Sequence, residues 1–322
     1  MSCIIPLFVP HEGCPCRCVF CNQCTIAGQT ERMTPERARE AIEQALRILP
    51  ADSAPQAAFY GGSFTAIPTE EQEALLAVTD DYLARGRIAS VRCSTRPDAI
   101  DPDTLARLKA HGMTVIELGA QSMDDTVLRL ARRGHTAQHT VQAARMIQQA
   151  GMSLILQTMA GLPGDTRETV RMTARRVAAL RPDGVRIYPV AVLPDTELFD
   201  LWKQGAYQPL DVETAAVWCA DMLEIFQEEH IPVIRMGLNP TEELNTTVAA
   251  GAYHPALGEL VWNEWWYRRL YAQLEAQEDG TVYVPDRELS RAIGQKRRNV
   301  LRLQQAFPHR QIHIRAESKK DV

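Results

Sequence analysis

The chain has 322 residues, 45% of them hydrophobic and 23% charged, and a formal net charge of −5. This size is enough to bury the core of one large domain and a small appendage. The apolar runs 249–256 and 190–193 are far too short to cross a bilayer, and no basic segment precedes the apolar start of the chain. We therefore expect a cytoplasmic protein without a membrane partner.

Short β-branched or apolar runs alternate with longer amphipathic runs from residue 3 to about residue 235, which is typical of βα units. The expected strands are 4–9, 57–60, 90–94, 114–119, 153–158 and 184–188, with a seventh candidate at 232–234. The expected helices include 34–48, 69–84 and 102–111. This pattern predicts an α/β fold, as either an open doubly wound sheet or a complete or partial barrel. In both folds, ligands bind at the carboxyl ends of the strands.

Five of the eight cysteines lie within eleven residues after the first expected strand: Cys14, Cys16, Cys18, Cys21 and Cys24. Disulfides across so short a segment would close strained loops, so metal binding is the expected role. Cys14, Cys18 and Cys21 have the spacing C-x3-C-x2-C, and three thiolates can bind three corners of a [4Fe-4S] cluster. Cys16 and Cys24 are then bystanders, alternative ligands or reactive thiols. A structural zinc site that uses them is the alternative.

The cysteine spacing resembles the motif of the radical SAM superfamily. This resemblance implies a partial (β/α)6-type barrel, a [4Fe-4S] cluster on Cys14, Cys18 and Cys21, and S-adenosylmethionine (SAM) on the iron that lacks a protein ligand. It further implies reductive cleavage of SAM to a 5′-deoxyadenosyl radical, with an electron donor such as flavodoxin or ferredoxin. Phe20 resembles the residue that packs near the SAM adenine.

Segments after the next strands also resemble SAM-binding elements. The turn 61–63, Gly-Gly-Ser, resembles a glycine motif whose backbone receives the SAM amino group. The segments 95–98, 117–122 and 132–136 resemble the TRPD, ELGVQS and RGHT segments in the radical SAM domain of the Elongator catalytic subunit family. In that resemblance Arg133 pairs with the SAM carboxylate. The residues expected to bind SAM are Phe20, Gly61, Gly62, Ser63, Thr95, Gln121, Arg133, Gln157 and Gly161.

Each of these residues also has a purely structural alternative, such as a surface ion pair for Arg133 or a satisfied buried amide for Gln157. The Elongator-type enzymes differ from this chain in two respects. They carry a longer insertion in the cysteine motif, and they continue into an acetyltransferase domain that the 322 residues do not resemble. Acetyl transfer and the formation of carboxymethyl-uridine are therefore not implied.

The last segment of the chain is basic. Residues 281–322 contain ten Lys/Arg and four Asp/Glu, a formal charge of +6, which leaves −11 on the rest. Such segregation favours contact with a polyanion, and a solvated helical face is the alternative. The order strand, helix, turn, helix, strand resembles the KH modules of the transcription factor NusA, which clamp single-stranded RNA on a G-x-x-G loop. Here arginine replaces the second glycine, and we expect RNA contacts at Gly294, Lys296, Arg297 and Arg298.

These features predict three units: a radical SAM partial barrel over 1–240, a helical extension or linker over 241–280, and a small α+β KH-like domain over 281–322. The leading hypothesis is a radical SAM enzyme that acts on RNA, in tRNA modification. One alternative is a radical SAM enzyme for a small molecule, resembling oxygen-independent coproporphyrinogen dehydrogenases, with a structural tail. Another is a non-enzymatic RNA-binding protein with an iron-sulfur or zinc loop. The sequence assigns no catalytic residue.

Overall fold

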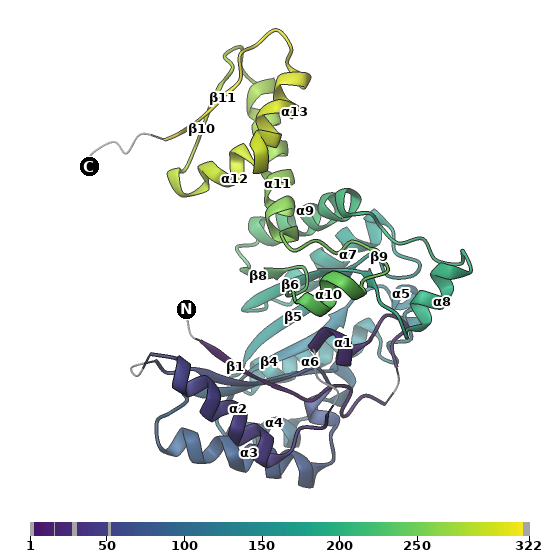
Figure 1. Ribbon diagram of the computed structural model, residues 1–322, viewed down its shortest axis with the longest axis vertical. Helices are drawn as coiled ribbons and strands as arrows, with labels where there is room; N and C mark the ends of the chain where they lie inside the picture. Colours follow the sequence, from purple (N-terminus) through teal and green to yellow (C-terminus); the bar gives the residue numbers. More distant parts are fainter. Residues whose placement is uncertain (1–2, 16, 28–30, 51–52, 318–322) are drawn as a thin grey trace.

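The computed structural model describes residues 3–15, 17–27, 31–50 and 53–317. Its centre is a curled parallel sheet of seven strands in the order β1-β2-β3-β4-β5-β6-β8 (Figure 1). The strands are β1 Ile4–Phe8, β2 Gln56–Tyr60, β3 Ser90–Thr95, β4 Met113–Gln121, β5 Ser153–Ala160, β6 Gly184–Pro189 and β8 Val233–Met236. All six expected strands and the seventh candidate form.

The strand order decides between the two expected α/β architectures. Each strand pairs with the next one along the main sheet, and the order never reverses. A doubly wound sheet would reverse its order at a switch point, whereas progressive pairing is the arrangement of a barrel. The prediction of a partial barrel is therefore confirmed, with seven strands instead of six.

The crossover helices begin where the sequence places capping residues. The Thr34 hydroxyl accepts a hydrogen bond from the Arg37 amide at the start of α2, and Asp101 accepts one from the Thr104 amide at the start of α4. The longer helices of the barrel are α2 Pro35–Ile48, α3 Thr69–Ala84, α4 Pro102–Ala110, α6 Ala137–Gln149, α7 Arg167–Ala178 and α9 Val212–Glu228. Shorter elements are α1 Gln23–Ala27, α5 Asp125–Leu130, α8 Glu197–Lys203, α10 Glu242–Thr247 and the antiparallel pair β7 Ala191–Val192 and β9 Ala250–Gly251.

The two faces of β4 show how the sheet separates the core from the site. Ile116, Leu118 and Ala120 are fully buried in the apolar core. Because side chains alternate along a strand, Glu117 and Gly119 lie on the opposite face. That face carries polar side chains from neighbouring strands, which form the floor of the site described below.

One long helix connects the barrel with the basic segment. Helix α11, Leu257–Glu275, packs against α9 along one part and against α12, Leu289–Ile293, and α13, Arg298–Ala306, along another. Figure 1 shows the last elements standing away from the barrel at the end of α11. The segment expected as an extension or linker thus contains a continuous helix that packs against the barrel and against the basic segment.

The basic segment has the predicted order of elements. Strand β10, Thr281–Val284, pairs in parallel with β11, His313–Ala316, and α12 and α13 lie between them in sequence. The 3-10 turn Gln295–Arg297 separates the two helices. In the part of the chain that the structure describes, no helix has the length and apolar character needed to span a membrane.

Candidate cofactor site

The cysteine loop follows β1 at the carboxyl edge of the sheet. Cys14, Cys18 and Cys21 are free thiols, and Cys18 is buried. The Val19 amide donates to the Ala131 carbonyl at 3.2 Å, and the Val19 carbonyl accepts from the Leu198 amide at 2.8 Å. The loop is therefore held by two segments that lie far away in sequence.

The neighbouring thiols of the loop act on the pKa of Cys21. Burial, followed by the neighbouring Cys18 and Cys14 thiols, raises the pKa of Cys21 to about 12. A thiol with so high a pKa is neutral at pH 7, and it loses its proton when it binds a metal. In the described residues, no three His, Cys, Asp or Glu side chains surround the position of a single metal ion. Cys16 lies outside the described residues.

The glycine turn after β2 packs directly on the cysteine loop. Gly61 has a φ of +92°, a conformation that glycine adopts without strain. A Cβ on Gly62 would lie 2.3 Å from the Val9 carbonyl oxygen, so no side chain fits there. Ser63 donates its amide to the Glu12 carbonyl at 2.8 Å, and its hydroxyl lies 3.3 Å from the Cys14 sulfur.

Gly13 of the cysteine loop packs equally closely against the glycine turn, and it was not among the predicted site residues. A Cβ on Gly13 would lie 2.2 Å from the Ser63 carbonyl oxygen, and its φ is +71°. The two loops thus require glycine on both sides of their contact. The sequence signal was its place directly before Cys14, but the close approach of the two loops is visible only in the structure.

Arg133 links the cysteine loop to the end of β4. Its Nη1 donates to the Cys18 sulfur at 3.1 Å, and its Nη2 donates to the Gly119 carbonyl at 2.7 Å. A Cβ on Gly119 would lie 2.8 Å from the Gln121 Nε2 and 3.2 Å from the Arg133 Nη2. Gly119 therefore leaves room for both side chains. It lies in the segment 117–122, but it was not predicted as a site residue.

Gln121 has two unusual features. Its φ is +64°, and it follows a register shift between β4 and β5, so its side chain is directed out of the regular strand pattern. Its Oε1 is buried without a hydrogen-bond partner among the described residues. A buried acceptor of this kind fits a ligand that brings a hydrogen-bond donor, such as an amino group or a ribose hydroxyl of SAM.

Two further residues lie near Arg133 and were not predicted as site residues. Arg96 donates to the Arg133 carbonyl at 2.6 Å and to Asp98 at 2.9 and 2.8 Å. The His135 Nε2 lies 3.2 Å from the Ala120 carbonyl. Burial, and then the Arg133 charge, lower the pKa of His135 to about 3, so this imidazole is neutral at physiological pH.

The remaining residues predicted to bind SAM have partners within the protein. Gln157 donates to Glu117 at 3.1 Å, and the Thr95 hydroxyl lies 2.6 Å from the Thr65 hydroxyl. The Gly161 amide donates to Asp165 at 3.1 Å, and Phe20 packs against a small apolar cluster beside the cysteine loop. The structure thus brings the cysteines, Ser63, Gln121 and Arg133 together. The other four predicted residues, Phe20, Thr95, Gln157 and Gly161, make contacts within the protein.

A buried polar network lies beneath this site and was not predicted. Glu117 is 0% exposed and accepts hydrogen bonds from the Tyr60 hydroxyl and the Arg92 Nη2, both at 2.6 Å. Gln157 donates to the same carboxylate at 3.1 Å, and the Arg186 Nε lies 2.9 Å from it. Five neighbouring strands, β2 to β6, supply one member each.

The basic turn forms between α12 and α13, with φ of +78° at Gly294 and left-handed backbone at Lys296 and Arg297. Lys296 and Arg297 are exposed. Arg298 instead donates its Nη1 to Glu213 of α9 at 2.9 Å. The four predicted RNA-binding residues are thus adjacent, but one of them is paired with a carboxylate of the barrel.

A parallel half-barrel with three cysteines after its first strand and a glycine turn after its second is the architecture of a radical SAM enzyme. A family model described as Radical SAM superfamily matches residues 8–177, and a Radical_SAM C-terminal domain model matches residues 182–267. The chain belongs to the radical SAM superfamily. Its enzymes use a [4Fe-4S] cluster and SAM, which confirms the cofactor prediction over the zinc alternative.

Curated relatives confirm the predicted resemblance to the Elongator family. The chain is 27% identical to a tRNA uridine(34) acetyltransferase of Methanocaldococcus infernus over 64% of this chain and 39% of the relative. It is 28% identical to the protein of that name from Dehalococcoides mccartyi over 69% and 56%, and 28% identical to human Elongator complex protein 3 over 46% and 31%. The chain spans less than two thirds of the length of each.

Solved structures support the fold. The archaeal Elp3 of Methanocaldococcus infernus superimposes with a TM-score of 0.63 at 23% identity, over 86% of this chain and 63% of that one. The coproporphyrinogen III oxidase of Escherichia coli, a radical SAM enzyme, superimposes with a TM-score of 0.53 at 19% identity, over 71% and 52%. The resemblance of 281–322 to KH modules stays a prediction.

Proposed function

We propose that this radical SAM enzyme binds its cluster through Cys14, Cys18 and Cys21 and acts on RNA, in tRNA modification. The cofactor assignment is supported by three free thiols on one loop, by the hydrogen bond from Arg133 to Cys18, and by the buried Gln121 oxygen that has no partner among the described residues. When bound, the cluster would supply the electron for reductive cleavage of SAM. An electron donor such as flavodoxin or ferredoxin would deliver that electron.

The residues around the cluster site have distinct roles in this proposal. Arg133 offers a planar cation for the SAM carboxylate, and Arg96 holds the backbone of Arg133 in place. His135 adds no second positive charge, because burial keeps it neutral. Gly62 and Gly13 let the two ligand-binding loops approach closely enough to share one site.

Replacing Arg133 with alanine is expected to weaken SAM binding by about 1.5–3 kcal/mol, because a charge-assisted pair to the carboxylate is lost. Iron content should stay at the wild-type level, since Arg133 supplies no iron ligand. Arg132→Ala is the matched control, because its side chain is 64% exposed and pairs with Glu197. Equilibrium dialysis with SAM, together with iron analysis, measures both effects. Unchanged SAM affinity in a folded Arg133→Ala protein would leave this residue a structural role only.

The RNA part of the proposal is supported by the basic turn and by the relatives. Lys296 and Arg297 are exposed at the start of α13, where helix dipole and backbone amides favour a phosphate. Neither has a described ion-pair partner, so their charges are available. Relatives named as tRNA uridine(34) acetyltransferases match 64% and 69% of this chain.

The double variant Lys296→Ala/Arg297→Ala is expected to weaken binding of bulk tRNA and to reduce the slope of log affinity against log salt by about one to two phosphate contacts. SAM cleavage without substrate should be unaffected. The control, Arg47→Ala/Arg87→Ala, removes the same charge from exposed positions on the barrel. Equal slopes for the two variants, or no RNA affinity of the wild type at low salt, would contradict RNA delivery and favour the small-molecule alternative.

A further inference from the structure

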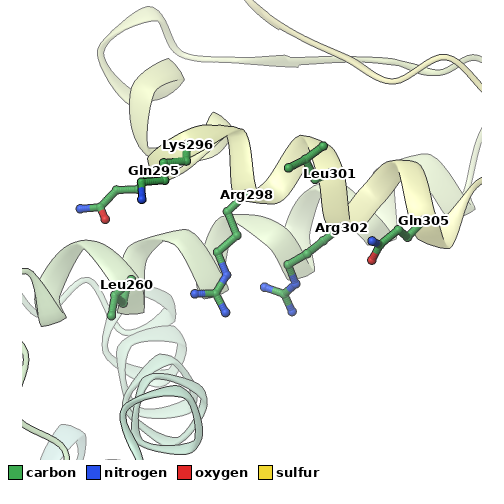
Figure 2. Close-up of a pocket in the computed structure, with 7 residues that line it drawn as sticks. All are labelled: Leu260, Gln295, Lys296, Arg298, Leu301, Arg302 and Gln305. Atoms are coloured by element: carbon green, nitrogen blue, oxygen red, sulfur yellow. The ribbon is translucent and has the colours of Figure 1, made fainter.

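An open groove of about 390 Å³ lies between α11 and α13 (Figure 2). Its apolar surface consists of Leu260 on α11 and Leu301 on α13, and Leu301 is 58% exposed. Helix α11 lies outside the predicted KH-like segment, so this groove exists only because that segment packs on the barrel's connecting helix. Its volume lies within the usual range of small-ligand sites.

Basic side chains line the same groove. Arg298 and Arg302 project side by side from α13, and Lys296 lies at the end near the turn (Figure 2). Arg302 is already committed to the protein. It donates to Glu264 at 2.8 Å and lies 3.5 Å from the centre of the Tyr267 ring.

Arg298 is held differently. Its partner Glu213 lies in the first turn of α9 and has a side chain that is 64% exposed. The hydrogen bond from Arg298 lowers the pKa of Glu213, so the pair is charged at neutral pH. An ion pair this exposed contributes only about 0–1 kcal/mol, so a phosphate can displace the carboxylate at little cost.

We propose that this groove binds one nucleotide of single-stranded RNA, which rests on the RNA-directed function proposed above. The base would contact Leu260 and Leu301, and the phosphate would bind Arg298 and Lys296. A carboxylate and a phosphate bind a guanidinium through two hydrogen bonds in the same way. In the free protein, the Glu213 carboxylate would therefore hold the place on Arg298 that the phosphate takes when RNA binds.

The polar ends of the groove fit a nucleobase. Gln295 is the first residue of the turn and Gln305 lies one helical turn beyond Leu301, and both are exposed. Each side-chain amide has a hydrogen-bond donor and an acceptor, and the edge of a base also carries both. Two amides and the cations of Lys296 and Arg298 beside an apolar surface favour a nucleotide over a purely apolar ligand.

The test measures binding of a short oligouridylate to the full chain at several salt concentrations. Glu213→Gln is expected to raise affinity about two- to fivefold and to steepen the slope of log affinity against log salt by about 0.7, the value for one phosphate contact on a single strand. Glu228→Gln is the matched control, since it removes the same charge from an exposed position at the other end of α9.

Leu301→Ser is expected to weaken binding roughly tenfold with an unchanged salt slope, because it removes apolar contact and no charge. Because Leu301 is exposed, the variant is expected to fold like the wild type, and circular dichroism checks this. An oligoglutamate peptide serves as the competing acidic ligand. If that peptide binds with the same sensitivity to Glu213→Gln and Leu301→Ser while oligouridylate does not, the groove binds protein and the proposal is overturned.

The outcomes also separate this proposal from the one on which it rests. Wild-type protein that fails to bind RNA would overturn both. If the wild type binds RNA and the Lys296→Ala/Arg297→Ala variant binds it less well, RNA delivery stands. In that case, Glu213→Gln and Leu301→Ser proteins that bind like the Glu228→Gln control would overturn the groove alone.

Discussion

Anaerobically reconstituted Cys18→Ala protein is expected to contain no [4Fe-4S] cluster, and Cys14→Ala and Cys21→Ala should behave in the same way. The wild type should bind about four irons with broad charge-transfer absorbance. Loss of one of three thiolates leaves a cube with two protein ligands, and no other described thiol is positioned by the same contacts. Cys18 in particular is buried and accepts a hydrogen bond from Arg133. Iron and sulfide analysis with visible spectroscopy measures the result.

Cys24→Ala is the matched control, because Cys24 lies in α1 directly after the loop and is half-buried. It should retain the wild-type iron content. Cys16→Ala extends the test to a position outside the described residues. If either of these variants loses the cluster while one of the three predicted ligands can be replaced without effect, the ligand assignment is wrong.

Replacing Glu117 with glutamine is expected to lower the free energy of unfolding of the apoprotein by about 3–5 kcal/mol, the cost of breaking a buried ion pair. Glutamine has nearly the same shape, but it leaves the charges of Arg92 and Arg186 without their counterion. These two side chains are only 9% and 15% exposed, so water cannot replace the lost carboxylate. Urea denaturation of both proteins at the same pH measures the difference.

Glu168→Gln is the control for this change. Glu168 pairs with Arg175, but its side chain is 74% exposed, so its removal should change stability by less than about 0.5 kcal/mol. Similar denaturation midpoints for the Glu117→Gln and wild-type proteins would show that the polar network around Glu117 is solvated. It would then contribute nothing to the rigidity of the floor beneath the cofactor.

Local patterns were sufficient for the elements of the fold. Strands are short and apolar, helices start at Thr34 and Asp101 with capping side chains, and both signals lie within a few neighbouring residues. The number of strands was less certain than their type, because β8, Val233–Met236, is partly exposed and carries an arginine. The choice between an open sheet and a barrel needed the strand order, which is a property of distant pairings.

By itself the sequence determined the superfamily, and it predicts the three cluster ligands because Cys14, Cys18 and Cys21 lie in one short loop whose covalent reach restricts them to one site. Only the tertiary structure decided which SAM-binding candidates lie around that loop and which, like Gln157, serve the network of Glu117. It also decided that Arg298 meets Glu213 across 85 positions of sequence. Such contacts depend on strand register and helix packing, which bring distant residues together in ways that no local spacing records.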